Sequence, residues 1–264
     1  MDNNTLHAPK TALITGASSG IGAEFARQLA AQGYGLTLVA RREDRLQNLA
    51  AELESTLYVP VELIVADLAE QAGLERVASR IGELPDLEFL VNNAGFGMSG
   101  HFEGIDYAIH LRAVQVHVLA SVRLAHAALQ GMVARRSGSI INVASMAGLI
   151  PVRNVTYSAT KAYLVSFSRA LHHELQGSGV RIQALCPGYV HTELHSSKLP
   201  PRAPAFMWST ADKVVAESLA ALRRNQVICI PGRIYRLIAA LGTSQLTYPL
   251  VRSAARIVLR RRAA

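Results

Sequence analysis

Tyr157 and Lys161 are the residues whose types and spacing most directly suggest chemistry. They stand four positions apart in Tyr157-Ser158-Ala159-Thr160-Lys161, and positions i and i+4 share one face of an α-helix. A free tyrosine has a pKa of about 10, and a neighbouring cation lowers that pKa because it favours the phenolate. The pair is therefore a candidate proton donor and acceptor, although the same pattern also occurs on ordinary amphipathic helices.

A glycine-rich turn near the N-terminus is the second chemical feature. The apolar, β-branched run 11–15 predicts a buried strand, and residues 23–31 have helical character. Between them lies Gly16-Ala17-Ser18-Ser19-Gly20-Ile21-Gly22, so strand, turn and helix follow in the order of a nucleotide-binding turn. Phosphates would lie at the helix N-terminus, where free N–H groups and the helix dipole favour negative charge. The spacing TGxxxGxG differs from the commoner GxGxxG, and such turns also serve structure alone.

The end of the second predicted strand, 35–40, bears on the choice of cofactor. An acidic residue there would suit the ribose of NAD(H), whereas an arginine suits the 2′-phosphate of NADP(H). The sequence has Arg41 and Arg42, with no carboxylate before Glu43. This favours NADP(H) over NAD(H), with Arg41 as the phosphate partner because it stands nearest to the strand end. The alternative is a solvated arginine pair at the start of the next helix.

Five motifs occur in the order typical of the short-chain dehydrogenase/reductase family, which this chain resembles from about residue 10 to 193. They are Thr15 to Gly22, Asn92-Asn93-Ala94-Gly95, Ser145, the tyrosine–lysine motif and Pro187-Gly188. The resemblance implies that Tyr157 is the catalytic acid and base, and that Ser145 steadies the substrate oxygen. It also implies that Lys161 lowers the pKa of Tyr157 and binds the nicotinamide ribose.

The same resemblance implies a cofactor-binding set. Asn93, Ala94 and Gly95 would line the adenosine side, Asp67 would lie near the adenine, and Thr192 would contact the cofactor beyond the Pro187-Gly188 turn. The full set is Thr15, Gly16, Ser18, Ser19, Gly20, Ile21, Gly22, Arg41, Asp67, Asn93, Ala94, Gly95, Tyr157, Lys161, Pro187, Gly188, Val190 and Thr192.

His117 marks a departure from the family pattern, which usually has an asparagine at this point of the chain. That asparagine is thought to hold a water in a proton relay to the lysine. Histidine can both donate and accept hydrogen bonds near neutral pH. His117 is therefore a candidate catalytic residue that substitutes for the asparagine or adds pH sensitivity; a tolerated replacement with reduced activity is the alternative.

The alternation of strand and helix patterns predicts an α/β fold. Strands are expected near 11–15, 35–40, 60–66, 87–92, 138–144, 179–186 and 226–231, with helical segments between most of them. We expect one domain, 1–264, built on a doubly wound, Rossmann-like parallel sheet of about seven strands with helices on both faces. By resemblance, residues 189–210 form a substrate segment, and residues 232–264 form a basic amphipathic C-terminal extension.

Apolar residues near the predicted site suggest a hydrophobic substrate, although each of them could equally be core. The predicted pocket comes from Phe96 to Phe102, Leu149 to Val155 and Tyr189 to Trp208, and includes Met98, Ile150, Val152, Phe206 and Met207. The primary hypothesis is reversible NADPH-dependent reduction of a hydrophobic ketone or aldehyde to an alcohol. One alternative is an NAD-linked secondary-alcohol dehydrogenase. The other is a non-catalytic NADP(H)-binding regulator or membrane-surface scaffold, against which the intact serine, tyrosine and lysine argue.

Charge and composition limit which partners the protein is expected to bind. The net charge is +8, and nine arginines but no acidic residues follow Glu217. The spacing of Arg252, Arg256 and Arg260 is typical of a basic amphipathic helix, which could contact anionic membranes or pack on the core or on another subunit. Few aromatic residues accompany this charge, so no nucleic-acid partner is expected. By family habit we expect a homodimer or homotetramer built on helices around 105–135 and 156–176.

Location and redox state follow from other residues. The start of the chain is polar, and no uninterrupted apolar run reaches the roughly 20 residues that span a bilayer. Cys186 and Cys229 lie beside apolar strand residues and are read as buried reduced thiols. A cytoplasmic location is expected. No metal is expected, because the pair His191 and His195 lacks the correctly placed glutamate of a zinc motif.

Overall fold

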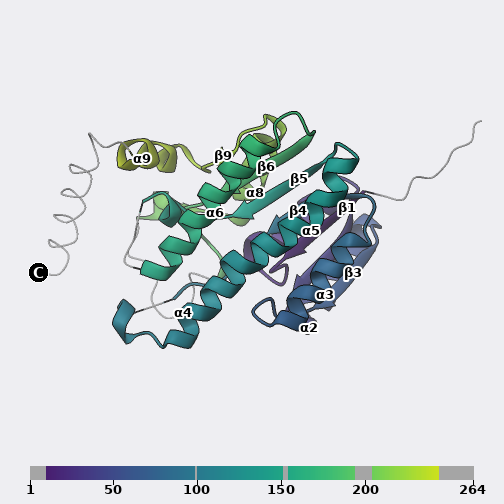
Figure 1. Ribbon diagram of the computed structural model, residues 1–264, viewed down its shortest axis with the longest axis horizontal. Helices are drawn as coiled ribbons and strands as arrows, with labels where there is room; N and C mark the ends of the chain where they lie inside the picture. Colours follow the sequence, from purple (N-terminus) through teal and green to yellow (C-terminus); the bar gives the residue numbers. More distant parts are fainter. Residues whose placement is uncertain (1–9, 99, 151–153, 194–203, 244–264) are drawn as a thin grey trace, which may run out of the picture.

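The computed structural model describes residues 10–98, 100–150, 154–193 and 204–243. Seven parallel strands form one sheet in the order β3-β2-β1-β4-β5-β6-β9 (Figure 1). Their bounds are β1 Thr11–Thr15, β2 Gly35–Ala40, β3 Val61–Val65, β4 Leu87–Asn92, β5 Gly138–Val143, β6 Val180–Leu185 and β9 Ile228–Cys229. All seven lie within the predicted ranges, so the predicted fold class is confirmed.

The strand order creates the position for a binding site. The chain runs outward from β1 through β2 to β3, then returns to the other side of β1 and continues through β4, β5 and β6. The central strands β2, β4 and β5 are buried along their whole length, as apolar strands covered on both faces must be. A reversal of strand order leaves a crevice at the carboxyl ends of β1 and β4.

Helices cover both faces of the sheet. The helices α1 Gly20–Ala30, α2 Glu43–Leu57 and α8 Ala211–Arg223 pack on one face through a cluster that includes Phe25, Leu46 and Val215. The helices α3 Gln71–Gly82 and α5 Ala120–Ala134 pack on the other through Val77, Leu124 and neighbouring apolar residues. Figure 1 shows α6, Val155–Glu174, beside α5.

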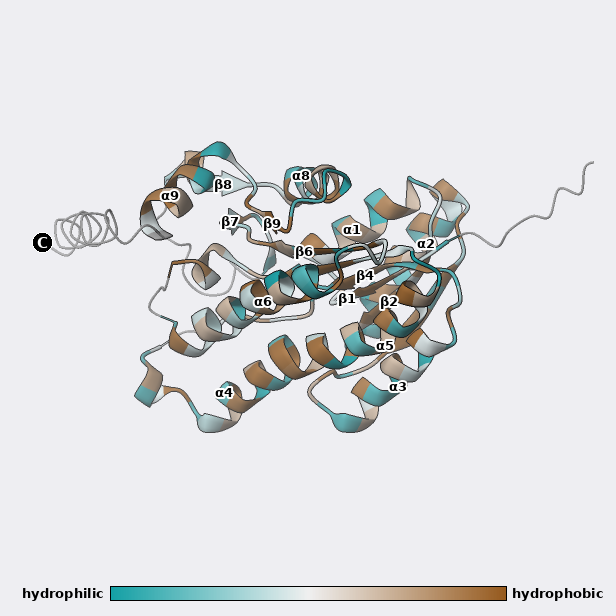
Figure 2. Ribbon diagram, turned by 45° about the horizontal axis from the view of Figure 1, so that its top comes forward, coloured by the Kyte–Doolittle hydropathy of each residue, from teal (hydrophilic) through white to brown (hydrophobic). Residues whose placement is uncertain are grey.

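The helix that precedes β5 is one long run with an irregular centre. It consists of α4 Tyr107–Val114, a π-helical turn Gln115–Leu119 and α5. Figure 2 shows this run mostly in the brown of hydrophobic residues. By length and composition it could cross a membrane. Here Ala113, Leu124, Ala128 and Met132 are buried, the last three in a cluster with strand residues, so it serves as a core helix of the fold.

Three elements near the C-terminus were not predicted in detail. The strands β7 Tyr189–Val190 and β8 Trp208–Ser209 form a separate parallel pair, and α9 Arg233–Thr243 follows β9. Tyr235 of α9 joins them, because its hydroxyl accepts a hydrogen bond from the Tyr189 N–H at 3.0 Å and donates to the Met207 carbonyl at 2.7 Å. Cys186 and Cys229 are buried and unpaired, as predicted.

Candidate active site

Ser145 and Tyr157 are placed by the end of β5 and the start of α6. Ser145 follows β5 closely, and its hydroxyl accepts a hydrogen bond from the Ala147 N–H at 3.1 Å. Asn154 caps α6, because its side-chain oxygen accepts from the Tyr157 N–H at 3.3 Å. The amide nitrogen of Asn154 also donates to the Met98 carbonyl at 2.5 Å. The first turn of α6 is thus tied to the segment that follows β4.

Three of the four predicted catalytic side chains lie together. The side chain of Ser145 lies near enough to Tyr157 to lower the pKa of its phenol, and Lys161 Nζ lies 5.7 Å from the centre of the Tyr157 ring. Lys161 is buried and donates from Nζ to the Val143 carbonyl at 2.7 Å. A β-carbon added to Gly95 would lie 3.6 Å from the same ammonium. A phenol, a hydroxyl and an ammonium therefore converge beside the turn that follows β4.

The protonation behaviour of this group differs from the expectation in one respect. Burial raises the pKa of Tyr157, and the nearby Ser145 side chain lowers it by less. Burial also lowers the pKa of Lys161 to about 8. The expected lowering of the tyrosine pKa by the ammonium is therefore not seen here, because desolvation dominates.

His117 is fully buried in the π-helical turn and joins two parts of the site. Its Nε2 accepts from the Phe96 N–H at 3.1 Å, and its Nδ1 lies 3.0 Å from Thr160 Oγ1. The Thr160 hydroxyl donates its one proton to the Tyr157 carbonyl at 2.9 Å, so the proton between Nδ1 and Thr160 must belong to the imidazole. Burial and the nearby Lys161 hold the pKa of His117 well below its ordinary value. The imidazole is thus a neutral link between the turn after β4 and α6.

The glycine turn has the backbone that its sequence predicted. Gly16 and Gly20 adopt φ angles of +65° and +58°, in the left-handed region that favours glycine. A β-carbon on Gly22 would lie 2.3 Å from the Gly16 carbonyl oxygen, so only glycine allows this approach of α1 to the turn. Ile21 packs partly against the core.

Thr15 and Asn93 lock the turns after β1 and β4 to each other. The Thr15 hydroxyl accepts from the Asn93 and Ala94 N–H groups, both at 3.0 Å, and donates to the Val91 carbonyl at 3.2 Å. Asn93 Nδ2 donates to the Thr15 and Gly16 carbonyls at 2.9 and 3.1 Å. These predicted cofactor residues therefore shape the turns.

A cavity lies beside these turns at the carboxyl ends of β1, β2 and β3. Three arginines and two serine hydroxyls supply its hydrogen-bond donors, which suit an anionic ligand such as a dinucleotide phosphate. Its lining includes Gly16, Ser18, Ser19, Arg41, Arg42, Asp67, Ala94, Gly95, Phe96 and Arg112.

The arginines of this cavity have different partners. Arg42 donates from Nη2 to Ser18 Oγ at 2.9 Å and to Ser19 Oγ at 2.8 Å. Arg41 forms a 3.9 Å ion pair with Asp67, to which Arg112 also donates. Burial alone would raise the pKa of Asp67, but hydrogen bonds from the Ala69 N–H and Arg112, together with the charges of Arg112 and Arg41, outweigh burial and lower that pKa.

No sequence motif marks Arg112. The choice of Arg41 as the phosphate partner stays a prediction, and Arg42 is the arginine that contacts the serines of the glycine turn. The adjacent arginines at 41 and 42 mark both positions as candidates, but the sequence does not give the direction of either side chain.

The turn after β6 also reaches the glycine turn. The Pro187 carbonyl accepts from the Met146 N–H at 2.9 Å, and Val190 is buried in β7. A β-carbon on Gly20 would lie 3.0 Å from the methyl group of Thr192. A β-carbon on Gly188 would collide with the Tyr235 ring, so α9 packs closely on this turn.

The predicted substrate-pocket residues have mixed positions. Leu149 packs against buried Leu164 and Val165 and so belongs to the core. Phe102 and Phe206 are exposed, while Trp208 stacks on the rings of Tyr189 and His191. Three segments of the predicted pocket lie outside the described residues: 99, 151–153 (which include Val152) and 194–203.

Comparison with known proteins agrees with this geometry. The short chain dehydrogenase family matches residues 10–202. The very-long-chain 3-oxoacyl-CoA reductase of Bos taurus is 31% identical over 220 residues, which cover 78% of this chain and 69% of that protein. A short-chain dehydrogenase from Sphingobium yanoikuyae, solved in complex with NADPH, has a TM-score of 0.81 and 33% identity, covering 96% of this chain and 95% of that one.

A second solved structure is similar to the same extent. The bulky-bulky ketone specific alcohol dehydrogenase from Comamonas testosteroni has a TM-score of 0.79 and 30% identity, again covering 96% of this chain and 95% of that one. By its sequence match and by its sheet, this chain belongs to the short-chain dehydrogenase/reductase family of oxidoreductases.

Proposed function

We propose that this protein is an NADPH-dependent oxidoreductase that reversibly reduces a hydrophobic ketone or aldehyde to an alcohol. The observation that carries the proposal is the convergence of Ser145, Tyr157 and Lys161 beside the turns after β1 and β4. Three such groups are what proton transfer to a carbonyl oxygen requires.

Each of the chain's own residues has a distinct part in this reaction. Ser145 and Tyr157 hydrogen-bond the carbonyl oxygen as negative charge develops on it, and Tyr157 delivers the proton. In the reverse direction the phenolate removes the proton from the alcohol. Lys161 supplies the neighbouring positive charge, and the neutral His117 holds α6 against the turn after β4. The bound nicotinamide would supply or accept the hydride.

The preference for NADP(H) rests on the arginines of the cavity. Arg42, Ser18 and Ser19 form a cluster of donors close to the end of β2, and Arg41, the predicted partner of the 2′-phosphate, lines the same cavity together with Arg112. Tyr157 and Lys161 remain the proposed partners of the nicotinamide side. The similar enzyme from Sphingobium yanoikuyae was solved with NADPH, which supports the same choice.

The substrate class rests on the relatives together with the apolar residues of this chain. One relative is named for very-long-chain 3-oxoacyl-CoA and another for bulky ketones. Met98 and Phe96 lie on the segment tied to the start of α6. A bulky, apolar ketone is therefore the proposed substrate.

A Tyr157→Phe variant tests the proposal. NADPH oxidation should be measured with bulky aryl ketones and 3-oxoacyl thioesters, and turnover should fall at least 100-fold, since general acid catalysis contributes about 10²–10⁴. The NADPH dissociation constant should stay within about 3-fold, because the phenol hydroxyl is not in the phosphate cavity. Tyr163→Phe, on the exposed side of the same helix, is the matched control. Equal activity in both variants would remove Tyr157 from the mechanism.

A further inference from the structure

Glu193 brings a carboxylate to the border of the cofactor cavity. It follows Thr192 directly, and Thr192 lies against Gly20 of the glycine turn. Arg42 Nη1 donates to Glu193 Oε2 at 2.8 Å, and Arg45 donates to the other carboxylate oxygen. An acidic side chain from the segment after β7 is thus fixed on an arginine of the phosphate-binding cluster.

Arg42 is shared between this carboxylate and the serines. Its Nε and Nη2 face Ser18 at 3.2 and 2.9 Å, and Nη2 also donates to Ser19 at 2.8 Å, which leaves Nη1 for Glu193. A phosphate bound at these serines would use the same guanidinium. Hydrogen bonds from Arg42 and Arg45 lower the pKa of Glu193 to about 2. A full negative charge is therefore present there at any physiological pH.

The ion pairs of Glu193 with Arg42 and Arg45 contribute little to the stability of the fold. The side chain of Glu193 is 47% exposed, and those of Arg42 and Arg45 are 41% and 43% exposed. Ion pairs at such exposed positions contribute little to folding because water and salt screen them. The carboxylate therefore acts electrostatically on whatever else binds Arg42.

We propose that Glu193 is a specificity-determining residue for the cofactor, because its carboxylate competes with the 2′-phosphate of NADP(H) for Arg42. The inference rests on the proposed use of NADP(H). NADH lacks the 2′-phosphate, so it binds with the Arg42–Glu193 pair intact. Glu193 thereby limits how strongly the protein prefers NADPH over NADH.

The test is a Glu193→Gln variant, which keeps the size of the side chain and removes its charge. Fluorescence titration should show the NADPH dissociation constant falling by about 5- to 10-fold, while that of NADH stays within about 2-fold. Calorimetry with 2′,5′-ADP and 5′-AMP should show the same contrast, because these probes isolate the 2′-phosphate from the nicotinamide. The gain should shrink as salt is raised.

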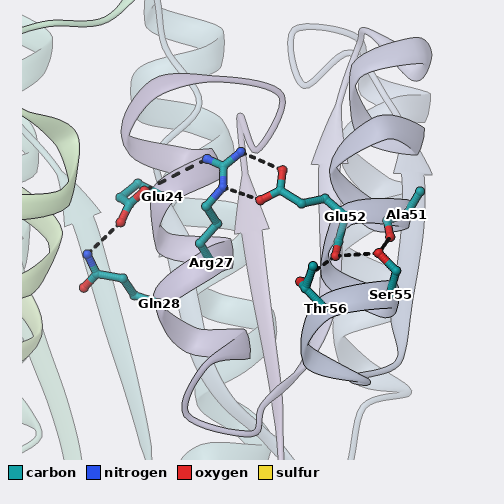
Figure 3. Close-up of polar contacts among 7 residues, drawn as sticks. All are labelled: Glu24, Arg27, Gln28, Ala51, Glu52, Ser55 and Thr56. Atoms are coloured by element: carbon teal, nitrogen blue, oxygen red, sulfur yellow. Dashed lines mark hydrogen bonds and ion pairs between the residues drawn. The ribbon is translucent and has the colours of Figure 1, made fainter.

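Glu52→Gln is the matched charge control. Glu52 pairs with Arg27 at 2.7 Å and is 44% exposed, and this pair bridges α1 and α2 (Figure 3). The variant removes the same charge without freeing Arg42, so both cofactors should bind as in the wild type. In an Arg42→Ala background, Glu193→Gln should give no gain.

Several outcomes would overturn the inference. They are weaker NADPH binding by Glu193→Gln, an equal change for both cofactors, an unchanged NADPH affinity, or a gain that persists without Arg42. Every arm of this experiment measures binding, so its result does not depend on the proposed reaction. Failure of the proposed reaction would appear as NADPH binding without any turnover that depends on Tyr157. A wild-type protein that bound no NADPH would overturn both.

Discussion

The buried imidazole of His117 is held between two parts of the site by its hydrogen bonds. Its two ring nitrogens face one N–H donor, from Phe96, and one hydroxyl, from Thr160, whose proton is already committed to the Tyr157 carbonyl. Only the neutral Nδ1–H tautomer satisfies all three groups. This geometry fits a positioning link, a role that was not predicted from the sequence, and not the predicted pH-sensitive role, because burial keeps the imidazole neutral near pH 7.

The neutral state of His117 predicts a pH dependence of stability. In the unfolded chain its pKa is about 6.5, whereas in the folded protein burial and Lys161 hold it well below that value. Below about pH 6.5 only the unfolded chain therefore binds this proton, and stability falls as pH falls. The free energy of unfolding should decline by up to about 1.4 kcal/mol per pH unit more steeply in the wild type than in His117→Asn.

Urea denaturation of both proteins between about pH 7 and 5 measures this difference. Turnover at the pH of best activity serves as the functional control, since asparagine can also donate and accept hydrogen bonds. Parallel stability curves would show that His117 binds its proton equally in both states.

At the scale of elements, β5 and α6 must be aligned because they carry Ser145 and Tyr157. A buried polar chain performs this alignment: Asn92 Nδ2 donates to Asn142 Oδ1 at 2.9 Å, and Asn142 Nδ2 donates to Ser168 Oγ at 2.9 Å. All three residues are buried, so a lost bond costs free energy because water cannot replace it. The chain therefore fixes the rotation of α6 on the sheet.

Asn142→Ala should consequently be costly. Ser168 loses an amide donor and Asn92 loses an acceptor, so we expect the free energy of unfolding to fall by about 1–3 kcal/mol. Turnover should fall with a smaller change in NADPH affinity, because the alignment of Ser145 with Tyr157 is disturbed more than the cofactor cavity. Chemical denaturation and steady-state kinetics measure the two effects. Asn48→Ala, at an exposed position of α2, is the control and should change stability by less than about 0.5 kcal/mol.

The elements also show what a sequence can predict. The seven strands were predictable because apolar, β-branched runs between turn residues are local signals, and the spacing of Tyr157 and Lys161 is local to one helix. The contact of Arg42 with Glu193 joins positions 151 apart in sequence and depends on side-chain direction, so no local pattern encodes it. The π-helical turn and the β7–β8 pair likewise arise from tertiary packing.

At the scale of the whole molecule, the exposed apolar side chains lie on separate surfaces. Tyr107, Leu111 and Leu119 are exposed along α4 and its continuation, on the helices where a homodimer or homotetramer is expected. That assembly stays a prediction, as does the cytoplasmic location. A second surface lies on α9, which Figure 1 shows at the periphery of the molecule.

The outer side of α9 adds exposed apolar residues to the basic C-terminal segment for which membrane contact is predicted. Ile234, Leu237 and Leu241 are 40%, 61% and 41% exposed, and their spacing places them along one side of the helix. Arg233 and Arg236 are exposed beside them. The basic residues 244–264 lie outside the described residues, but their sequence adds five arginines and no acidic side chain. An apolar stripe flanked by cations is typical of helices that bind anionic lipid surfaces.

Vesicle sedimentation decides whether α9 contacts a membrane. The wild type should sediment with vesicles containing phosphatidylglycerol and much less with pure phosphatidylcholine, because the attraction to anionic lipid adds to apolar burial. Leu237→Glu should weaken the binding several-fold, since it places a negative charge in the apolar stripe. Leu57→Glu, at an exposed leucine of α2, should leave it unchanged. If Leu237→Glu instead changed only the oligomeric state measured by light scattering, the stripe on α9 would be a protein interface, and the membrane prediction would be wrong.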